Sequence, residues 1–215
     1  MLVRLRPARD IQNREQVFTQ PRAAAPNPAI PSRLQANASW AGSLSLGLGH
    51  ETMEVRDSAV EDAERIAALI DTVARERLFL AGTVGFSVDD TRAFITSTRS
   101  AGGVHIVGIE SEEIIGWCDI VRHPFEGMRH VGRLGMGVRR DRRSQGIGRK
   151  LLKAATERAQ GSGIERIELE VFASNHAAIC LYESFGFELE GRKVAGRRLD
   201  GCTDDILIYA RRRLA

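Results

Sequence analysis

Residues 134–152 contain three consecutive features: a strand in which every second residue is glycine, a basic turn and an amphipathic helix. The strand reads Leu-Gly-Met-Gly-Val, residues 139–150 hold six bases against one acid, and Ile147, Leu151 and Leu152 recur at helical spacing. Gly146 and Gly148 let the backbone approach a ligand closely, and the free N–H groups of a helix's first turn attract an anion. The segment therefore predicts a strand connected to a helix by a phosphate-binding turn.

Two common phosphate-binding motifs do not fit this segment. It lacks the G-x-x-x-x-G-K-S/T pattern of a P-loop, and the third glycine position of a dinucleotide fingerprint is Leu151. A solvated, arginine-rich loop that caps an ordinary helix stays open as the alternative on spacing alone.

Strands and helices are mixed from Met53 to the C-terminus. Alternating or continuous apolar runs predict strands, and apolar residues at helical spacing predict helices. The expected strands are residues 53–57, 104–110, 114–122, 130–138, 164–172, 187–194 and 203–210, and the expected helices are residues 66–77, 87–99, 146–160 and 175–185. The last two strands form a hairpin that turns at Asp200-Gly201. This order predicts an α/β domain with a mixed sheet.

Composition excludes several classes of protein. No uncharged apolar run approaches the roughly 20 residues of a membrane helix. The three cysteines, Cys118, Cys180 and Cys202, are too few for a disulfide framework and show no zinc spacing, which favours a reducing, cytoplasmic compartment. Residues 51–215 carry a net charge of −1, so nucleic acid is not an expected partner.

Residues 1–51 form an Arg/Ala/Pro/Ser-rich leader that precedes a domain of residues 52–215. The first 50 residues carry a net charge of +4 and show no sustained periodicity, which predicts disorder. A dispensable tail or an upstream start is favoured over a transit peptide. A chain that starts at Met53 is expected to keep full activity.

A second informative stretch contains Glu170, Asn175 and Tyr182. Glu170 lies on the strand face opposite Ile167, Leu169 and Val171. Asn175 stands at a helix N-cap after the strand, and Tyr182 follows about two turns later on the same helix face. Taken singly, each residue also fits a structural role: a surface carboxylate, a cap and a core aromatic.

Together the two stretches resemble the GNAT superfamily of N-acetyltransferases. The matching segments are R-x-x-G-x-G (Arg143, Gly146, Gly148), E-V-x-x-x-N (Glu170, Asn175) and A-x-x-L-Y-x-x-x-G-F (Ala178 to Phe187). The middle part is similar to ribosomal-protein-alanine acetyltransferases, and the C-terminal part to bacterial L-amino-acid N-acetyltransferases. The resemblance implies a mixed, mostly antiparallel sheet flanked by helices, in which a splayed strand pair binds the cofactor.

The resemblance also implies a set of site residues. Acetyl-CoA would bind as co-substrate to Met136, Gly137, Val138, Arg143, Ser144, Gln145, Gly146, Ile147, Gly148, Arg149 and Asn175. Glu170 would act as general base, through water, and Tyr182 would protonate the departing thiolate. A backbone N–H near Val138 would hold the thioester oxygen.

The expected acceptor is a primary amine, with a small amino acid or related amine favoured over a protein N-terminus. A non-catalytic CoA-binding module and a nucleic-acid binder are the rival functions, the latter weakened by the lack of interleaved aromatic residues. Neither a membrane nor a metal is expected, since His123, His130 and His176 show no metal-binding spacing. The oligomeric state stays open, with a homodimer among the expectations.

Two further residues are ambiguous in the sequence. Asp119 could act on the acceptor as a second base or as an anchor for its ammonium group. It could also be a carboxylate at the end of a strand with no such role, and this interpretation is favoured. Cys180 is expected to be a small core residue of the helix that carries Tyr182.

Overall fold

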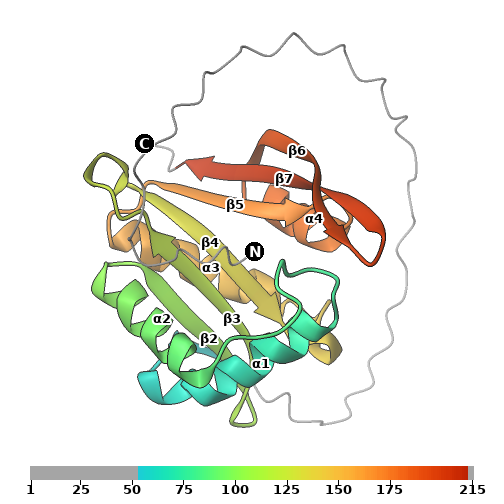
Figure 1. The fold of residues 1–215 in the computed structure, drawn as a ribbon. Coiled ribbons are helices and arrows are strands. Elements are labelled where there is room, and N and C mark those ends of the chain that lie inside the picture. The colour runs from blue at the N-terminus through green and yellow to red at the C-terminus, as the bar shows by residue number, and fades with distance from the viewer. Residues whose placement is uncertain (1–52, 213–215) are drawn as a thin grey trace, which may run out of the picture. The chain divides into compact units, whose positions relative to one another are not determined.

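The computed structural model of the protein describes residues 53–212, and the leader of residues 1–51 predicted from the sequence lies outside them. Seven strands form one sheet in the order β1-β2-β3-β4-β5-β7-β6 (Figure 1). Their bounds are β1 Glu54–Asp57, β2 Val104–Glu110, β3 Glu113–Arg122, β4 Val131–Val138, β5 Arg166–Phe172, β6 Glu188–Leu199 and β7 Cys202–Arg212. Only β4 and β5 pair in parallel, and the other neighbours are antiparallel. The expected mixed, mostly antiparallel sheet is confirmed.

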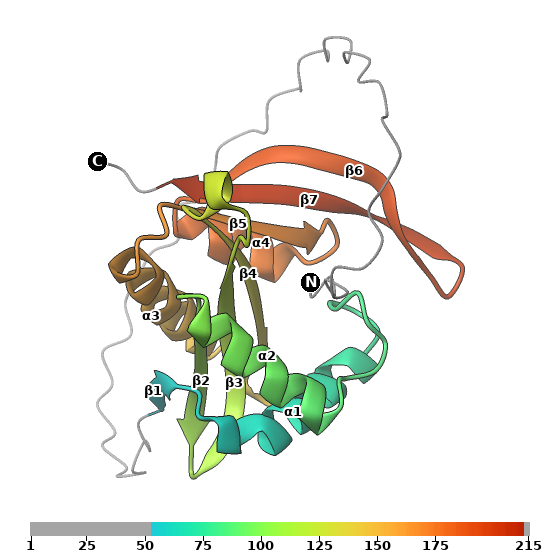
Figure 2. The ribbon, with the colours of Figure 1, turned by 60° about the vertical axis from the view of Figure 1, so that its left-hand side comes forward.

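Helices cover both faces of the sheet (Figure 2). Their bounds are α1 Ala63–Arg75, α2 Val88–Ser100, α3 Ile147–Gly161 and α4 His176–Ser184. Helices α1 and α2 pack with Val107 and Trp117 in one core cluster, and α3 packs with Cys118 and Leu134 in the other. None of the helices within residues 53–212 is long and apolar enough to cross a membrane.

Local signals set the ends of the helices. The Ser87 hydroxyl accepts a hydrogen bond from Asp90 N at 3.0 Å, which confirms Ser87 as the N-cap of α2. Asn175 caps α4, since its side-chain oxygen accepts from Ala178 N at 3.2 Å. Helix α1 ends at Arg75, two residues before the expected end, because Arg77 adopts the left-handed region with φ 60°.

The C-terminal hairpin is longer than the sequence predicts. It turns at Asp200-Gly201 as expected, and both residues have positive φ, 52° and 77°, which matches the twist of a tight hairpin. Strand β6 continues past Val194 to Leu199 through an irregularity between Lys193 and Arg197. Apolar alternation cannot reveal this extension, because its side chains are mostly exposed.

Candidate functional site

Strands β4 and β5 separate after a short paired start. Val131, Gly132 and Arg133 pair with residues 166–168, and no pair joins the rest of the two strands. Each strand follows its other neighbour instead: β4 pairs with β3 up to Val138, and β5 pairs with β7 up to Phe172. The two strands therefore leave a common point and diverge (Figure 1).

Alternation of hydrogen bonds determines which backbone groups of β4 face the gap. Arg139 N donates to Ile115 O, and His123 N donates to Val131 O, both at 2.9 Å. Odd-numbered residues of β4 thus bond to β3, and the N–H and C=O groups of Met136 and Val138 point toward β5. Gly137 has its backbone in the β3 ladder.

Gly137 is required for steric reasons. A Cβ at this position would lie 2.2 Å from the Trp117 ring, which covers it from β3. Because an indole buried in the core cannot move aside at little cost, only glycine fits here.

The start of α3 presents a run of unpaired amides. Ser144 and Gly146 both have positive φ, 61° and 79°, so the chain turns sharply before the helix. Lys150 N is the first helical amide to reach a carbonyl, that of Gly146, at 3.1 Å. Within residues 53–212 no hydrogen bond is made by the amides of residues 144–149. Free amides at a helix start attract an anion.

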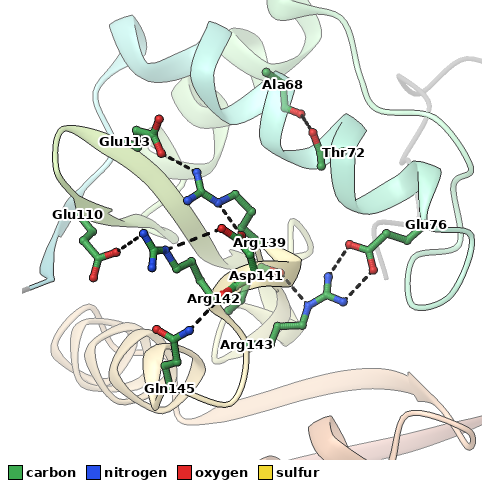
Figure 3. A network of polar contacts seen from close by, with 11 residues as sticks. Ala68, Thr72, Glu76, Glu110, Glu113, Arg139, Asp141, Arg142, Arg143 and Gln145 are labelled. Atoms are coloured by element: carbon green, nitrogen blue, oxygen red, sulfur yellow. Dashed lines mark hydrogen bonds and ion pairs between the residues drawn. The ribbon is translucent and has the colours of Figure 1, made fainter.

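The arginines of this turn are largely paired with acids (Figure 3). Arg139 contacts Glu113 at 2.6 Å, and Arg142 contacts Glu110 at 3.0 Å. Arg143 makes two bonds of 2.7 Å to Glu76 at the end of α1. These three pairs offset half of the six positive charges of residues 139–150.

A cavity of about 470 Å³ joins the gap to the start of α3. It is lined by Val73, Phe79, Leu80, Leu134, Gly135, Met136, Gly137, Val138, Arg143, Ser144, Gly146, Gly148, Arg149, Glu170, Val171, Asn175, Ala177, Ala178, Leu181 and Tyr182. Every site residue expected from the sequence lines it except Gln145 and Ile147. Gln145 turns its side chain to Asp141 O, and Ile147 is buried in the core under α3. For Gln145 and Ile147, only the backbone amide is available to a ligand.

Glu170 and Tyr182 both reach this cavity. Oε1 of Glu170 accepts from Lys193 Nζ at 2.6 Å, and Oε2 is buried without a hydrogen-bond partner among the described residues. Tyr182 is 7% exposed and packs against the Phe187 ring. Burial raises the pKa of Tyr182, so its hydroxyl keeps its proton at neutral pH.

Two interpretations from the sequence are wrong. Asp119 does not lie at a strand end: it stands within β3, opposite Gly135, and is 2% exposed. Cys180 is exposed on α4 and is not a core residue. The second error arises because Tyr182, two positions later and on the opposite side of the helix, takes the inward position.

Sequence reasoning also missed part of the site. Glu76 and Lys193, which hold Arg143 and Glu170, are distant in sequence and carry no local signal. The apolar wall of Val73, Phe79 and Leu80 comes from α1 and the loop after it. No group of three or more His, Cys, Asp or Glu side chains within residues 53–212 could hold a metal ion.

Known proteins resemble this chain in sequence. The chain is 27% identical over 140 residues to the L-methionine sulfoximine/L-methionine sulfone acetyltransferase of Pseudomonas aeruginosa, covering 64% of this chain and 81% of that protein. It is 42% identical over 69 residues to the [Ribosomal protein bS18]-alanine N-acetyltransferase of Escherichia coli, covering 32% of this chain and 47% of that protein.

Comparisons with solved structures and with family profiles agree with these sequence similarities. A GNAT superfamily phosphinothricin acetyltransferase from Sinorhizobium meliloti, solved in complex with acetyl-CoA, has the same fold. Its TM-score is 0.71 at 18% identity, over 75% of this chain and 89% of that chain. The profile of the acetyltransferase (GNAT) family matches residues 67–187. The chain therefore belongs to the acetyltransferase (GNAT) family and is an N-acetyltransferase.

Proposed function

We propose that the protein transfers the acetyl group of acetyl-CoA to the amino group of a small amino acid or a related amine. One observation carries this proposal: a single cavity joins the free amides of α3, the open edge of β4, Glu170 and Tyr182. The first two features suit the cofactor, and the last two suit the transfer.

The residues present fit acetyl-CoA, which supplies an activated acetyl thioester when bound. The unpaired amides of residues 144–149 would hold its diphosphate, together with the positive end of the α3 dipole. The gap-facing groups of Met136 and Val138 would bond to the pantetheine arm as an added strand would. The Val138 carbonyl already accepts from Arg143 Nε at 2.9 Å, which leaves its N–H for the ligand.

Glu170 would remove the proton from the acceptor amine, directly or through water. An amine with a pKa of roughly 8 to 10 is mostly protonated at pH 7 and cannot attack a thioester in that form. Oε2 of Glu170 has no hydrogen-bond partner among the described residues, while Oε1 is held by Lys193. Lys193 is thus a positioning residue that fixes the orientation of the carboxylate.

Tyr182 would donate a hydrogen bond or a proton to the departing thiolate. Its hydroxyl is protonated at neutral pH, since burial raises its pKa. The Met136 N–H, close to Val138 and also facing the gap, would stabilise the oxygen on which negative charge develops, and the Met136 carbonyl and the Val138 N–H then remain for the pantetheine arm. The residues proposed for these roles line the same cavity, which supports the proposal.

The surroundings of the cavity favour a small acceptor over a protein N-terminus. The tip of the β6–β7 hairpin is tied to the loop after α1, because Arg77 pairs with Asp200 and Arg197 Nη2 donates to Arg77 O, each at 2.5 Å (Figure 2). These contacts join the hairpin tip to the loop that carries Phe79 and Leu80, two residues that line the cavity. The similarity to the methionine sulfone acetyltransferase also spans twice as much of this chain as that to the ribosomal-protein enzyme, 64% against 32%.

A substrate screen tests the proposal. The purified protein is mixed with acetyl-CoA and, one at a time, L-methionine sulfoximine, L-methionine sulfone, the common L-amino acids and a peptide with N-terminal alanine, and release of the CoA thiol is followed. We expect release with at least one amino acid or analogue and little with the peptide. Release with the peptide alone would contradict the choice of acceptor, and binding of acetyl-CoA without any release would indicate a non-catalytic module.

A further inference from the structure

We propose that Asp119 is the residue that binds the ammonium group of the acceptor before transfer. This inference rests on the proposed N-acetyltransfer and adds a second carboxylate to the acceptor site. It follows from the position of Asp119, from its unpaired oxygen and from the charges around it.

Asp119 stands next to the cavity with only a glycine between them. It lies opposite Gly135 in the β3–β4 ladder, and Gly135 lines the cavity. A Cβ on Gly135 would lie 3.1 Å from both carboxylate oxygens of Asp119, so the carboxylate lies against the bare face of that residue. Because Gly135 has no side chain, nothing from this position covers the carboxylate on the cavity side.

The carboxylate is buried and incompletely bonded. Asp119 is 2% exposed, and its Oδ1 has no hydrogen-bond partner among the described residues. The Trp117 side chain, two residues away on the same face of β3, is a hydrogen-bonding neighbour that lowers the pKa of Asp119 less than burial raises it, and its Nε1 makes no well-formed hydrogen bond within the described residues. Buried groups of this kind reduce stability and are rare in folded proteins, which favours a functional explanation.

The described groups around Asp119 do not supply a positive charge. His105 pairs with it from β2, but burial lowers the pKa of His105 to about 4, and its Nδ1 bonds to Ser58 Oγ at 2.6 Å. The negative charge of Asp119 helps to raise the pKa values of Cys118 and Tyr182, and both side chains are neutral at pH 7. A cation is therefore the ligand that this carboxylate suits.

A primary ammonium fits both the charge and the position. Gly135 lines the same cavity as the apolar side chains of Val73 and Leu80, and we place the acceptor beside these residues. An amine held there by Asp119 would still need Glu170 to remove its proton. Asp119 thus acts in binding, and Glu170 in transfer.

The test compares variants in steady-state kinetics with L-methionine sulfone as the acceptor probe. Asp119→Asn keeps the shape and removes the charge, and we expect KM for the amine to rise about 10- to 100-fold, the range for loss of a charge-assisted hydrogen bond. The Kd for acetyl-CoA, measured by calorimetry, should not change. Gly135→Ala, which puts a methyl group between the carboxylate and the cavity, should also raise this KM.

Asp62→Asn is the matched control. Asp62 is also a buried aspartate, 1% exposed, but it is held by Arg56 and Arg65 and does not line the cavity. The Asp62→Asn substitution should lower the stability of the protein and leave KM for the amine unchanged. An unchanged KM in Asp119→Asn, or an equal rise in Asp62→Asn, would overturn the role of Asp119 while leaving the acetyltransfer intact. A wild-type protein that acetylates no amine would overturn both proposals.

Discussion

Two buried aspartates, Asp62 beside α1 and Asp119 within β3, have opposite surroundings. Asp62 accepts from Arg56 at 2.6 Å, from Arg65 at 2.5 Å and from Ala59 N at 2.8 Å, and these bonds, led by Arg56, lower its pKa to about 2. Asp119 keeps an unpaired oxygen, and burial raises its pKa to about 7. Both side chains are removed from water, and only one has its charge compensated by described residues.

The different surroundings of the two aspartates indicate how a structural carboxylate can be distinguished from a functional one. A buried charge that the fold itself satisfies stabilises the folded state, because its partners are present whenever the chain is folded. A buried carboxylate left incompletely satisfied costs stability and is retained where a ligand completes it. Glu170 combines the two cases, since Lys193 satisfies one oxygen and the other has no hydrogen-bond partner among the described residues.

The largest expected effect tests the free oxygen of Glu170. Glu170→Gln should lower kcat about 10²- to 10⁴-fold at neutral pH, because the amide cannot accept the amine proton. The loss should shrink at high pH, where the amine is already neutral. A pH series of initial rates measures this, and an equal loss at every pH would show that Glu170 is structural, as Asp62 is.

The next effect concerns Tyr182, a buried polar group that carries no charge. Tyr182→Phe keeps the ring that packs on Phe187 and removes only the hydroxyl. We expect kcat to fall about 10²-fold, a typical contribution of general acid catalysis, with the Kd for acetyl-CoA nearly unchanged. Rapid-mixing kinetics and calorimetry separate the two quantities. An unchanged rate would exclude Tyr182 as the acid.

The comparison of the aspartates itself predicts stability changes of opposite sign. Asp62→Asn should cost about 1–2 kcal/mol at pH 7, after a discount for its partly exposed arginine partners. This contribution is present above pH 4 and is lost as the pH falls toward 2, since the folded-state pKa is lowered.

Asp119→Asn should instead stabilise the protein at pH 8, by up to about 4 kcal/mol, and change little at pH 4. The sign follows because its folded-state pKa is raised, so the wild type loses stability as the pH rises from about 4 through 7. Urea unfolding at the two pH values checks both variants. Destabilisation of Asp119→Asn at pH 8 would mean that the fold does satisfy this carboxylate.

The smallest effect concerns the turn before α3. Gly146 has φ 79°, and a Cβ there would contact nothing within 4 Å, so Gly146→Ala adds backbone strain alone. We expect about 1 kcal/mol of backbone strain. Relaxation of the turn would displace the free amides and raise the Kd for acetyl-CoA several-fold. Calorimetry with acetyl-CoA measures it. Gly161→Ala in the last turn of α3, also free of contacts, is the control and should leave this Kd unchanged.

The sequence predicted the fold where its signals are local. The N-caps at Ser87 and Asn175 and the turn at Asp200-Gly201 each depend on a few neighbouring residues. The motifs at Arg143–Gly148 and Glu170–Tyr182 likewise indicated the family, which the family profile confirms. Strand β6 was underestimated, because its exposed, basic second half has no apolar alternation.

What the sequence determined by itself is the order of the elements and the residue types at the turn before α3, because short-range sterics and hydrogen bonding fix both. Only the tertiary structure decided the partners. It paired Arg143 with Glu76 and Glu170 with Lys193, and it placed Asp119 against Gly135 inside the sheet. These contacts join residues distant along the chain, and their energies depend on burial, which exists only once the sheet and helices have packed.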